Sequence, residues 1–248
     1  FKPYRKEILD DKNIITCDDI GKNTTEFSLL THQKIVRDYL NLYSPYRGLL
    51  LYHGLGSGKT CTSIAIAEGM KSTKKVMILL PASLERNYIE ELKKCGDSLY
   101  KKQQHWEWIS LKTNPEALDT LSSILNLPIE YIKRKKGAWL VNYKKENNYD
   151  TLNANEINSL DDQLDKMIES KYQFIKYNGL RREKLKNLSD NFETNIFDNT
   201  IVIIDEAHNF ISRIVNKLSK EKDIVYDERG NKEKYPYALS LILYEMLL

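Results

Sequence analysis

Short apolar runs alternate along the chain with longer segments in which apolar residues recur at helical spacing. The most compact runs consist mainly of aliphatic residues and lie at 49–52, 76–80 and 201–204. Such runs are typical of strands that are buried on both faces of a parallel sheet. Helical spacing is found between them, at 31–42, 61–70 and 84–95. The pattern therefore predicts an α/β fold with a mostly parallel sheet flanked by helices.

The remaining elements are predicted from the same two periodicities. Strands are expected at 106–109, 139–141 and 172–177, and helices at 112–132 and 160–168. An Asn-rich stretch at 147–158 is expected to form an exposed loop, and a polar turn at 227–231 should precede a last helix that opens at 235–237. We predict an N-terminal arm at 1–26, one lobe over 27–248, and a surface insertion within it at about 97–170.

A phosphate-binding loop is predicted at Gly54-Leu55-Gly56-Ser57-Gly58-Lys59-Thr60, between an apolar run and a helix. The glycines let backbone N–H groups turn onto phosphate oxygens at the positive end of the new helix. Lys59 would reach the β- and γ-phosphates of ATP, and the Thr60 hydroxyl would ligate Mg²⁺. His53 stands where the usual pattern has its first glycine. The alternative is a plain glycine turn between a strand and a helix.

A second motif, Asp205-Glu206-Ala207-His208, follows the apolar run at 201–204. A parallel strand delivers the residues after it to the carboxyl edge of the sheet, where ligands bind. Asp205 would hold Mg²⁺, and Glu206 would orient and deprotonate the attacking water. The alternative is a strand followed by an acidic helix N-terminus, and the phosphate loop elsewhere in the chain makes it less favoured.

Together the two motifs resemble the DEAH-box of superfamily 2 helicases and translocases. Leu29-Leu30-Thr31-His32-Gln33 is similar to the glutamine motif of that family, which implies that Gln33 reads adenine. From spacing alone, Gln33 would be an ordinary residue on a solvated helix face. The stretch Pro81-Ala82-Ser83-Leu84 resembles the motif that contacts nucleic acid, in the form found in Swi2/Snf2-like translocases. From spacing alone it would be only a strand-to-helix turn.

A narrower resemblance rests on 50–60, 174–179 and 205–210. These segments are similar to helicase-like ATPases of large cytoplasmic DNA viruses, including the poxvirus early transcription factor and nucleoside triphosphatase group. The resemblance implies that Asn178-Gly179 face the nucleic acid and that His208 couples the nucleotide site to a motif of the last strand.

These resemblances imply the first of two RecA-like lobes in a nucleic-acid-dependent ATPase, with ATP and Mg²⁺ at the site. The second lobe, absent from this sequence, would supply an arginine worth ~10³–10⁵ in rate, so the isolated lobe should hydrolyse ATP only weakly. The Pro-Ala-Ser-Leu sequence at 81–84 favours DNA over RNA as the nucleic acid along which the motor would move. Subunits of RNA polymerase or transcription factors are possible partners in viral transcription.

Two other functions remain open from the residues. A RecA-like lobe without catalysis could act as a scaffold in a viral transcription or packaging complex, although the presence of Lys59, Thr60, Asp205 and Glu206 argues against it. A small-molecule phosphotransferase is the third option, and the residues at 81–84 count against it.

Composition sets further limits. The 38 basic and 35 acidic residues leave a formal net charge of +3, so any nucleic-acid surface must be local. Three widely spaced cysteines, Cys17, Cys61 and Cys95, predict reduced thiols without a disulfide or a zinc site. We expect no membrane contact and a cytoplasmic location, including a viral factory or virion. The first residue, Phe1, and the apolar end at Leu248 suggest a fragment of a longer protein.

Overall fold

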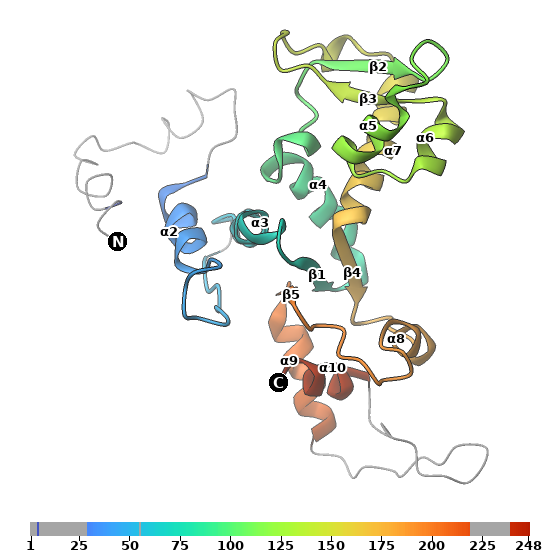
Figure 1. Cartoon of the computed structure of the whole chain (residues 1–248). Helices are drawn as coiled ribbons and strands as arrows, with labels where there is room; N and C mark the ends of the chain where they lie inside the picture. Colours follow the sequence, from blue (N-terminus) through green and yellow to red (C-terminus); the bar gives the residue numbers. More distant parts are fainter. Residues whose placement is uncertain (1–3, 5–28, 55, 219–238) are drawn as a thin grey trace, which may run out of the picture. The chain divides into compact units, whose positions relative to one another are not determined.

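The computed structural model describes residues 4, 29–54, 56–218 and 239–248 (Figure 1). Three predicted features lie outside these residues: all but one position of the arm at 1–26, the turn at 227–231, and the helix opening at 235–237. The chain divides into two compact units. Unit 1 comprises Phe1–Thr73 and Asn87–Lys171, and unit 2 comprises Lys74–Arg86 and Tyr172–Leu248.

Unit 2 contains a three-stranded parallel sheet in the order β4-β1-β5. The central strand β1 (Lys75–Leu80) pairs with β4 (Tyr172–Lys176) on one side and with β5 (Thr200–Ile204) on the other. All three strands run in the same direction, so their carboxyl ends meet at one edge. The predicted α/β class with a parallel sheet flanked by helices is confirmed.

Three helices pack against this sheet: α8 (Arg182–Leu188), α9 (Ala207–Leu218) and α10 (Leu239–Leu247). A 3₁₀ turn, η1 (Ala82–Leu84), follows β1. The shared core includes Met77, Leu79, Ile175, Leu185, Phe210, Ile214 and Ile242. The prediction that 201–204 is buried on both faces is wrong, because β5 is an edge strand of the described sheet and its residues are only half-buried.

Unit 1 carries the remaining helices and a separate antiparallel pair of strands. Its helices are α2 (Thr31–Tyr39), α3 (Lys59–Met70), α5 (Ala117–Leu125), α6 (Ile129–Lys135) and α7 (Ala154–Lys171), together with most of α4 (Glu85–Cys95). The strands are β2 (Trp106–Ser110) and β3 (Gly137–Val141), and short 3₁₀ turns are η2 (Ser98–Tyr100) and η3 (Tyr149–Thr151). That 97–170 is an insertion stays a prediction.

The strand predicted at 49–52 is wrong: the structure gives these residues no regular secondary structure. A strand forms only where a neighbour completes its backbone hydrogen bonds, and no described residue pairs with this run. The side chains of Leu50 and Tyr52 are accordingly 77% and 93% exposed. The phosphate loop is therefore preceded by a segment without regular secondary structure.

Two further predictions need correction. The helix expected at 112–132 is two helices, because Asn126 closes α5 with a φ of 52° and Pro128 opens α6. The Asn-rich stretch becomes helical from Ala154, because Asn153 caps α7. The Asn153 side chain accepts the N–H groups of Asn155 and Glu156, and the Glu156 carboxylate accepts the N–H of Asn153.

The expectation of three reduced thiols is also wrong. A disulfide joins Cys61 in the first turn of α3 to Cys95 at the end of α4, with Cα atoms 5.6 Å apart. Sequence spacing could not indicate this pair, because packing of the two helices brings together residues 34 positions apart. Among the described helices, none combines the length and apolar character needed to cross a membrane.

Candidate functional site

The predicted phosphate loop has the backbone geometry that its glycines allow. Gly56 and Gly58 take φ values of 76° and 73°, in the left-handed region that favours glycine. Gly58 is the N-cap of α3, so the loop ends where the free N–H groups of a helix begin. The Ser57 hydroxyl donates to the Gly54 carbonyl at 2.8 Å and closes the loop on itself.

Lys59 folds back over this loop. Its Nζ lies 3.2 Å from the carbonyl oxygen of Gly54 and 3.3 Å from that of His53. The ammonium group is thus placed above the backbone that would cradle a phosphate. Thr60 follows in the first turn of α3, where its hydroxyl would be available as a hard oxygen ligand.

Gln33 is buried against the same loop. Its side-chain oxygen accepts the Leu30 N–H at 2.9 Å, and its side-chain nitrogen donates to the Gly58 carbonyl at 3.2 Å. A Cβ atom at Gly58 would lie 2.3 Å from that nitrogen. Gln33 therefore supports the loop, a contact that sequence reasoning missed because it depends on where α2 packs. His32 adds a second link, with Nε2 3.1 Å from the Ser57 carbonyl.

The second motif forms the turn between β5 and α9. The Asp205 N–H donates to the Leu79 carbonyl at 2.9 Å, which extends the pairing of β5 with β1. Glu206 has a φ of 49°, unusual for a non-glycine residue and worth roughly 1–3 kcal/mol of strain of a kind that clusters at functional sites. Nδ1 of the exposed His208 lies 3.3 Å from a Glu206 carboxylate oxygen.

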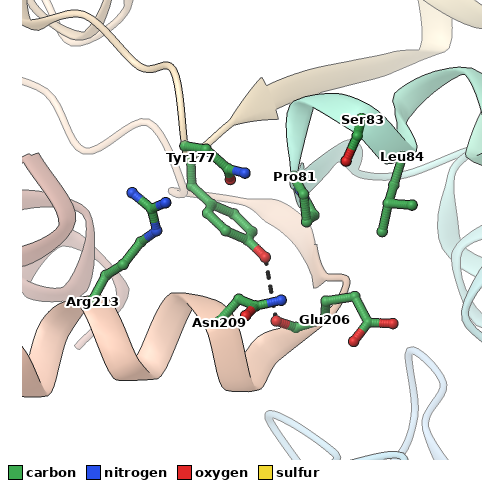
Figure 2. A pocket seen from close by; sticks show the side chains of 8 residues that line it. Pro81, Ser83, Leu84, Tyr177, Glu206, Asn209 and Arg213 are labelled. Carbon is green, nitrogen blue, oxygen red and sulfur yellow. Dashed lines mark hydrogen bonds between the residues drawn. The ribbon is translucent and has the colours of Figure 1, made fainter.

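A pocket of about 410 Å³ adjoins this turn (Figure 2). Its lining residues come from the segments that follow β1 and β4, from the turn and from α9: Pro81, Ser83, Leu84, Tyr177, Asn178, Glu206, Asn209 and Arg213. Three residues predicted to contact nucleic acid, Pro81, Ser83 and Asn178, thus share a pocket with Glu206. Ala82 and Gly179 are not among the lining residues.

Tyr177, Asn209 and Arg213 are pocket residues that sequence reasoning missed. The helical spacing of α9 from Glu206 could have indicated Asn209 and Arg213, which lie three and seven positions further on. Figure 2 shows the Tyr177 hydroxyl directed at the turn and the Arg213 guanidinium on the other side of the ring. Burial, and then the charges of Asp205 and Glu206, raise the pKa of Tyr177, so its hydroxyl stays protonated.

The predicted site residues fall into two groups. Gln33 and the loop from Gly54 to Thr60 belong to unit 1. The carboxylates Asp205 and Glu206, with His208 and the pocket, belong to unit 2. The first group has donors of the type that bind a triphosphate, namely backbone N–H groups at the positive-φ glycines and the Lys59 ammonium. The oxygen donors of Thr60 and Asp205 are of the type that Mg²⁺ prefers.

Comparisons with known proteins show the family to which the chain is similar. The family model described as "Type III restriction enzyme, res subunit" matches residues 26–228. A candidate ATP-dependent RNA helicase of Acanthamoeba polyphaga mimivirus is 33% identical over 73% of this chain and 24% of its own length. A second candidate ATP-dependent RNA helicase of that virus is 27% identical over 83% of this chain and 18% of its own length.

A candidate helicase of Frog virus 3 (isolate Goorha) is 45% identical over 65 residues, which make up 25% of this chain and 7% of that protein. The chain thus spans about a quarter or less of the length of these relatives. No solved structure matches it significantly.

Proposed function

Since the chain belongs to the helicase-like family described as the type III restriction enzyme res subunit, we propose that it is the ATP-binding, RecA-like lobe of a nucleic-acid-dependent ATPase. The observation that carries the proposal is the loop at the start of α3, where Gly56 and Gly58 have positive φ values and Lys59 folds over the loop carbonyls. A plain strand-to-helix turn has no need of a lysine in that place.

Each group of the site has a proposed role. The backbone N–H groups of 56–59 and the Lys59 ammonium bind the β- and γ-phosphates of ATP. Gln33 holds the Gly58 carbonyl, and reading adenine would require its amide to give up one of its present contacts. When bound, Mg²⁺ would neutralise charge on the phosphate oxygens, with Thr60 and Asp205 as its protein ligands.

Glu206 is the proposed base that orients the attacking water. Its carboxylate is exposed at the turn and lies beside His208, which we propose couples the site to the rest of the motor. Glu206 deprotonates the water as the new bond to the γ-phosphorus forms and the bond to the ADP oxygen breaks. A second RecA-like lobe would supply the arginine that stabilises the transferring phosphoryl group, so this lobe alone should be weakly active.

The nucleic-acid track is proposed to pass the pocket lined by Pro81, Ser83 and Asn178. The names of the mimivirus relatives refer to RNA helicases, whereas the Pro81–Leu84 form favours a DNA translocase. We also propose that the protein moves along nucleic acid during viral transcription, with polymerase or transcription factor subunits as its partners.

The test is ATP hydrolysis by the complete protein that carries this chain, with and without single-stranded DNA, duplex DNA and RNA. Glu206→Gln should abolish turnover and leave nucleotide binding intact. Glu183→Gln, at an exposed carboxylate of α8, is the matched control and should behave as wild type. Stimulation by one nucleic acid identifies the track. Nucleotide-independent binding of a partner protein, without turnover, would favour a scaffold instead.

A further inference from the structure

Tyr177 connects two strands that are not neighbours in the sheet. It follows β4, whereas the Asp205–Glu206 turn follows β5, and β1 lies between them. The Tyr177 hydroxyl lies 3.2 Å from the carbonyl oxygen of Asp205 and 3.2 Å from that of Glu206 (Figure 2). Its one proton is therefore shared between both carbonyls of the turn.

The Tyr177 ring is itself held in place. Its backbone N–H donates to the Leu80 carbonyl at 3.2 Å, which extends the pairing of β4 with β1. The ring is 7% exposed and packs on Phe210 of α9, with ring centroids 5.4 Å apart. A side chain fixed at both ends transmits a backbone displacement at 177 to the atoms that its hydroxyl contacts.

The turn needs such support because Glu206 has a positive φ, and strained residues of this kind persist only where their surroundings determine them strongly. The Glu206 carbonyl also accepts the Asn209 N–H at 2.9 Å, and the Asp205 N–H is held by Leu79. The backbone of the turn is thus fixed to β1 and α9, and the Tyr177 hydroxyl adds a bond from the end of β4.

The residue after Tyr177 is Asn178, which lines the pocket together with Ser83 and Glu206. We propose that Tyr177 is a positioning residue that holds the Asp205–Glu206 turn and passes nucleic-acid contact at Asn178 to the carboxylates of the ATPase site. This proposal rests on the function proposed above. Contact at Asn178 fixes the backbone at 177, the hydroxyl fixes the turn, and Glu206 then holds the attacking water in line.

Tyr177→Phe in the complete protein tests this role, because it removes the hydroxyl and keeps the ring on Phe210. Turnover at saturating nucleic acid should fall about five- to tenfold, the expected cost of one hydrogen bond that acts on the transition state. The KM for ATP and the affinity for the nucleic acid should each change less than about twofold. The ratio of stimulated to unstimulated turnover should fall by the same factor.

Tyr131→Phe is the matched control, since it removes the hydroxyl of another buried ring, in α6 of unit 1. It should leave the stimulation ratio at the wild-type value. If Tyr177→Phe lowers only the thermal stability and keeps that ratio, Tyr177 is merely structural and the proposal is overturned.

If Tyr177→Phe raised the KM for ATP and left kcat unchanged, the positioning role would also be overturned. A wild-type protein without turnover would overturn the proposed function, and the Tyr177 role with it. Stimulated wild-type turnover that Tyr177→Phe leaves unchanged would overturn the Tyr177 role alone.

Discussion

Replacing Gly58 by alanine tests the geometry of the phosphate loop. The new Cβ atom would sit on a residue with a φ of 73°, and a left-handed conformation costs an L-residue roughly 1–2 kcal/mol. It would also lie 2.3 Å from the Gln33 side-chain nitrogen and displace that amide. The amide would lose its bonds to Leu30 and Gly58, each worth about 0.5–1.5 kcal/mol.

The Gly58 carbonyl would not be left without a donor, because the Thr62 N–H and hydroxyl bond to it at 2.9 and 3.0 Å. The expected loss of stability is therefore roughly 2–5 kcal/mol. Gly69→Ala is the matched control in the same helix, where a Cβ meets nothing within 4 Å. It should stabilise the chain by about 0.5–1 kcal/mol, because alanine is the better helix former.

The assay is urea unfolding of both variants and wild type, followed by titration with ATP. The unfolding midpoints are compared where the dependence of the unfolding free energy on urea concentration is the same. Gly58→Ala should lower the midpoint and weaken nucleotide binding, and Gly69→Ala should raise the midpoint with binding unchanged. If the two midpoints moved in the same direction, the left-handed conformation at Gly58 or its contact with Gln33 would be refuted.

Three further outcomes are expected. The residues of the Cys61–Cys95 disulfide are 34 positions apart, so opening it should cost about 4 kcal/mol of stability by loop-closure entropy. Dithiothreitol should therefore lower the Tm of wild type and of Cys17→Ser but leave the Tm of Cys95→Ser unchanged. Lys59→Ala should abolish the rise in Tm that ATP produces, and the loss of its bonds to the His53 and Gly54 carbonyls should lower the Tm without nucleotide by only a few degrees. Burial raises the pKa of Tyr131 from 10.0 to about 12. Its protonated phenol therefore stabilises the fold below pH 10, and that stability is lost as the pH rises towards 12. In urea titrations, the free energy of unfolding of Tyr131→Phe should depend less on pH between 10 and 12 than that of wild type.

The parts of the site that could be predicted are those determined by residues close to one another in the sequence. The loop around Lys59 and the turn after β5 depend on residue types at fixed spacing, and both form where the sequence placed them. The run at 49–52 has the composition of a strand, but a strand also needs a partner, which composition cannot supply. Local signals therefore predicted where the helix start and the turn form more reliably than they predicted strand pairing.

The contacts that sequence reasoning missed all join residues far apart in the chain. Gln33 reaches Gly58 across 25 positions, and Tyr177 reaches Asp205 across 28. Neither residue type indicates its contact, because a glutamine on a helix or a tyrosine after a strand has many ordinary uses. Only the packing of α2 beside the loop, and of β4 beside β1, makes these contacts possible.

Gln33 and Tyr177 also have a feature in common that separates two kinds of variant. Each bonds to backbone carbonyls of a motif rather than to its reactive side chains. Substituting Glu206 removes a proposed reactive carboxylate and leaves the backbone bonds of the turn in place, so a catalytic defect should come without a large change in stability. Substituting Gln33 or Tyr177 leaves the chemistry and shifts its geometry, so graded defects should follow how well the replacement keeps the bond. Gln33→Glu keeps the acceptor for Leu30 but places a buried negative charge against the Gly58 carbonyl and the phosphate loop, so it should weaken nucleotide binding more than Gln33→Ala does.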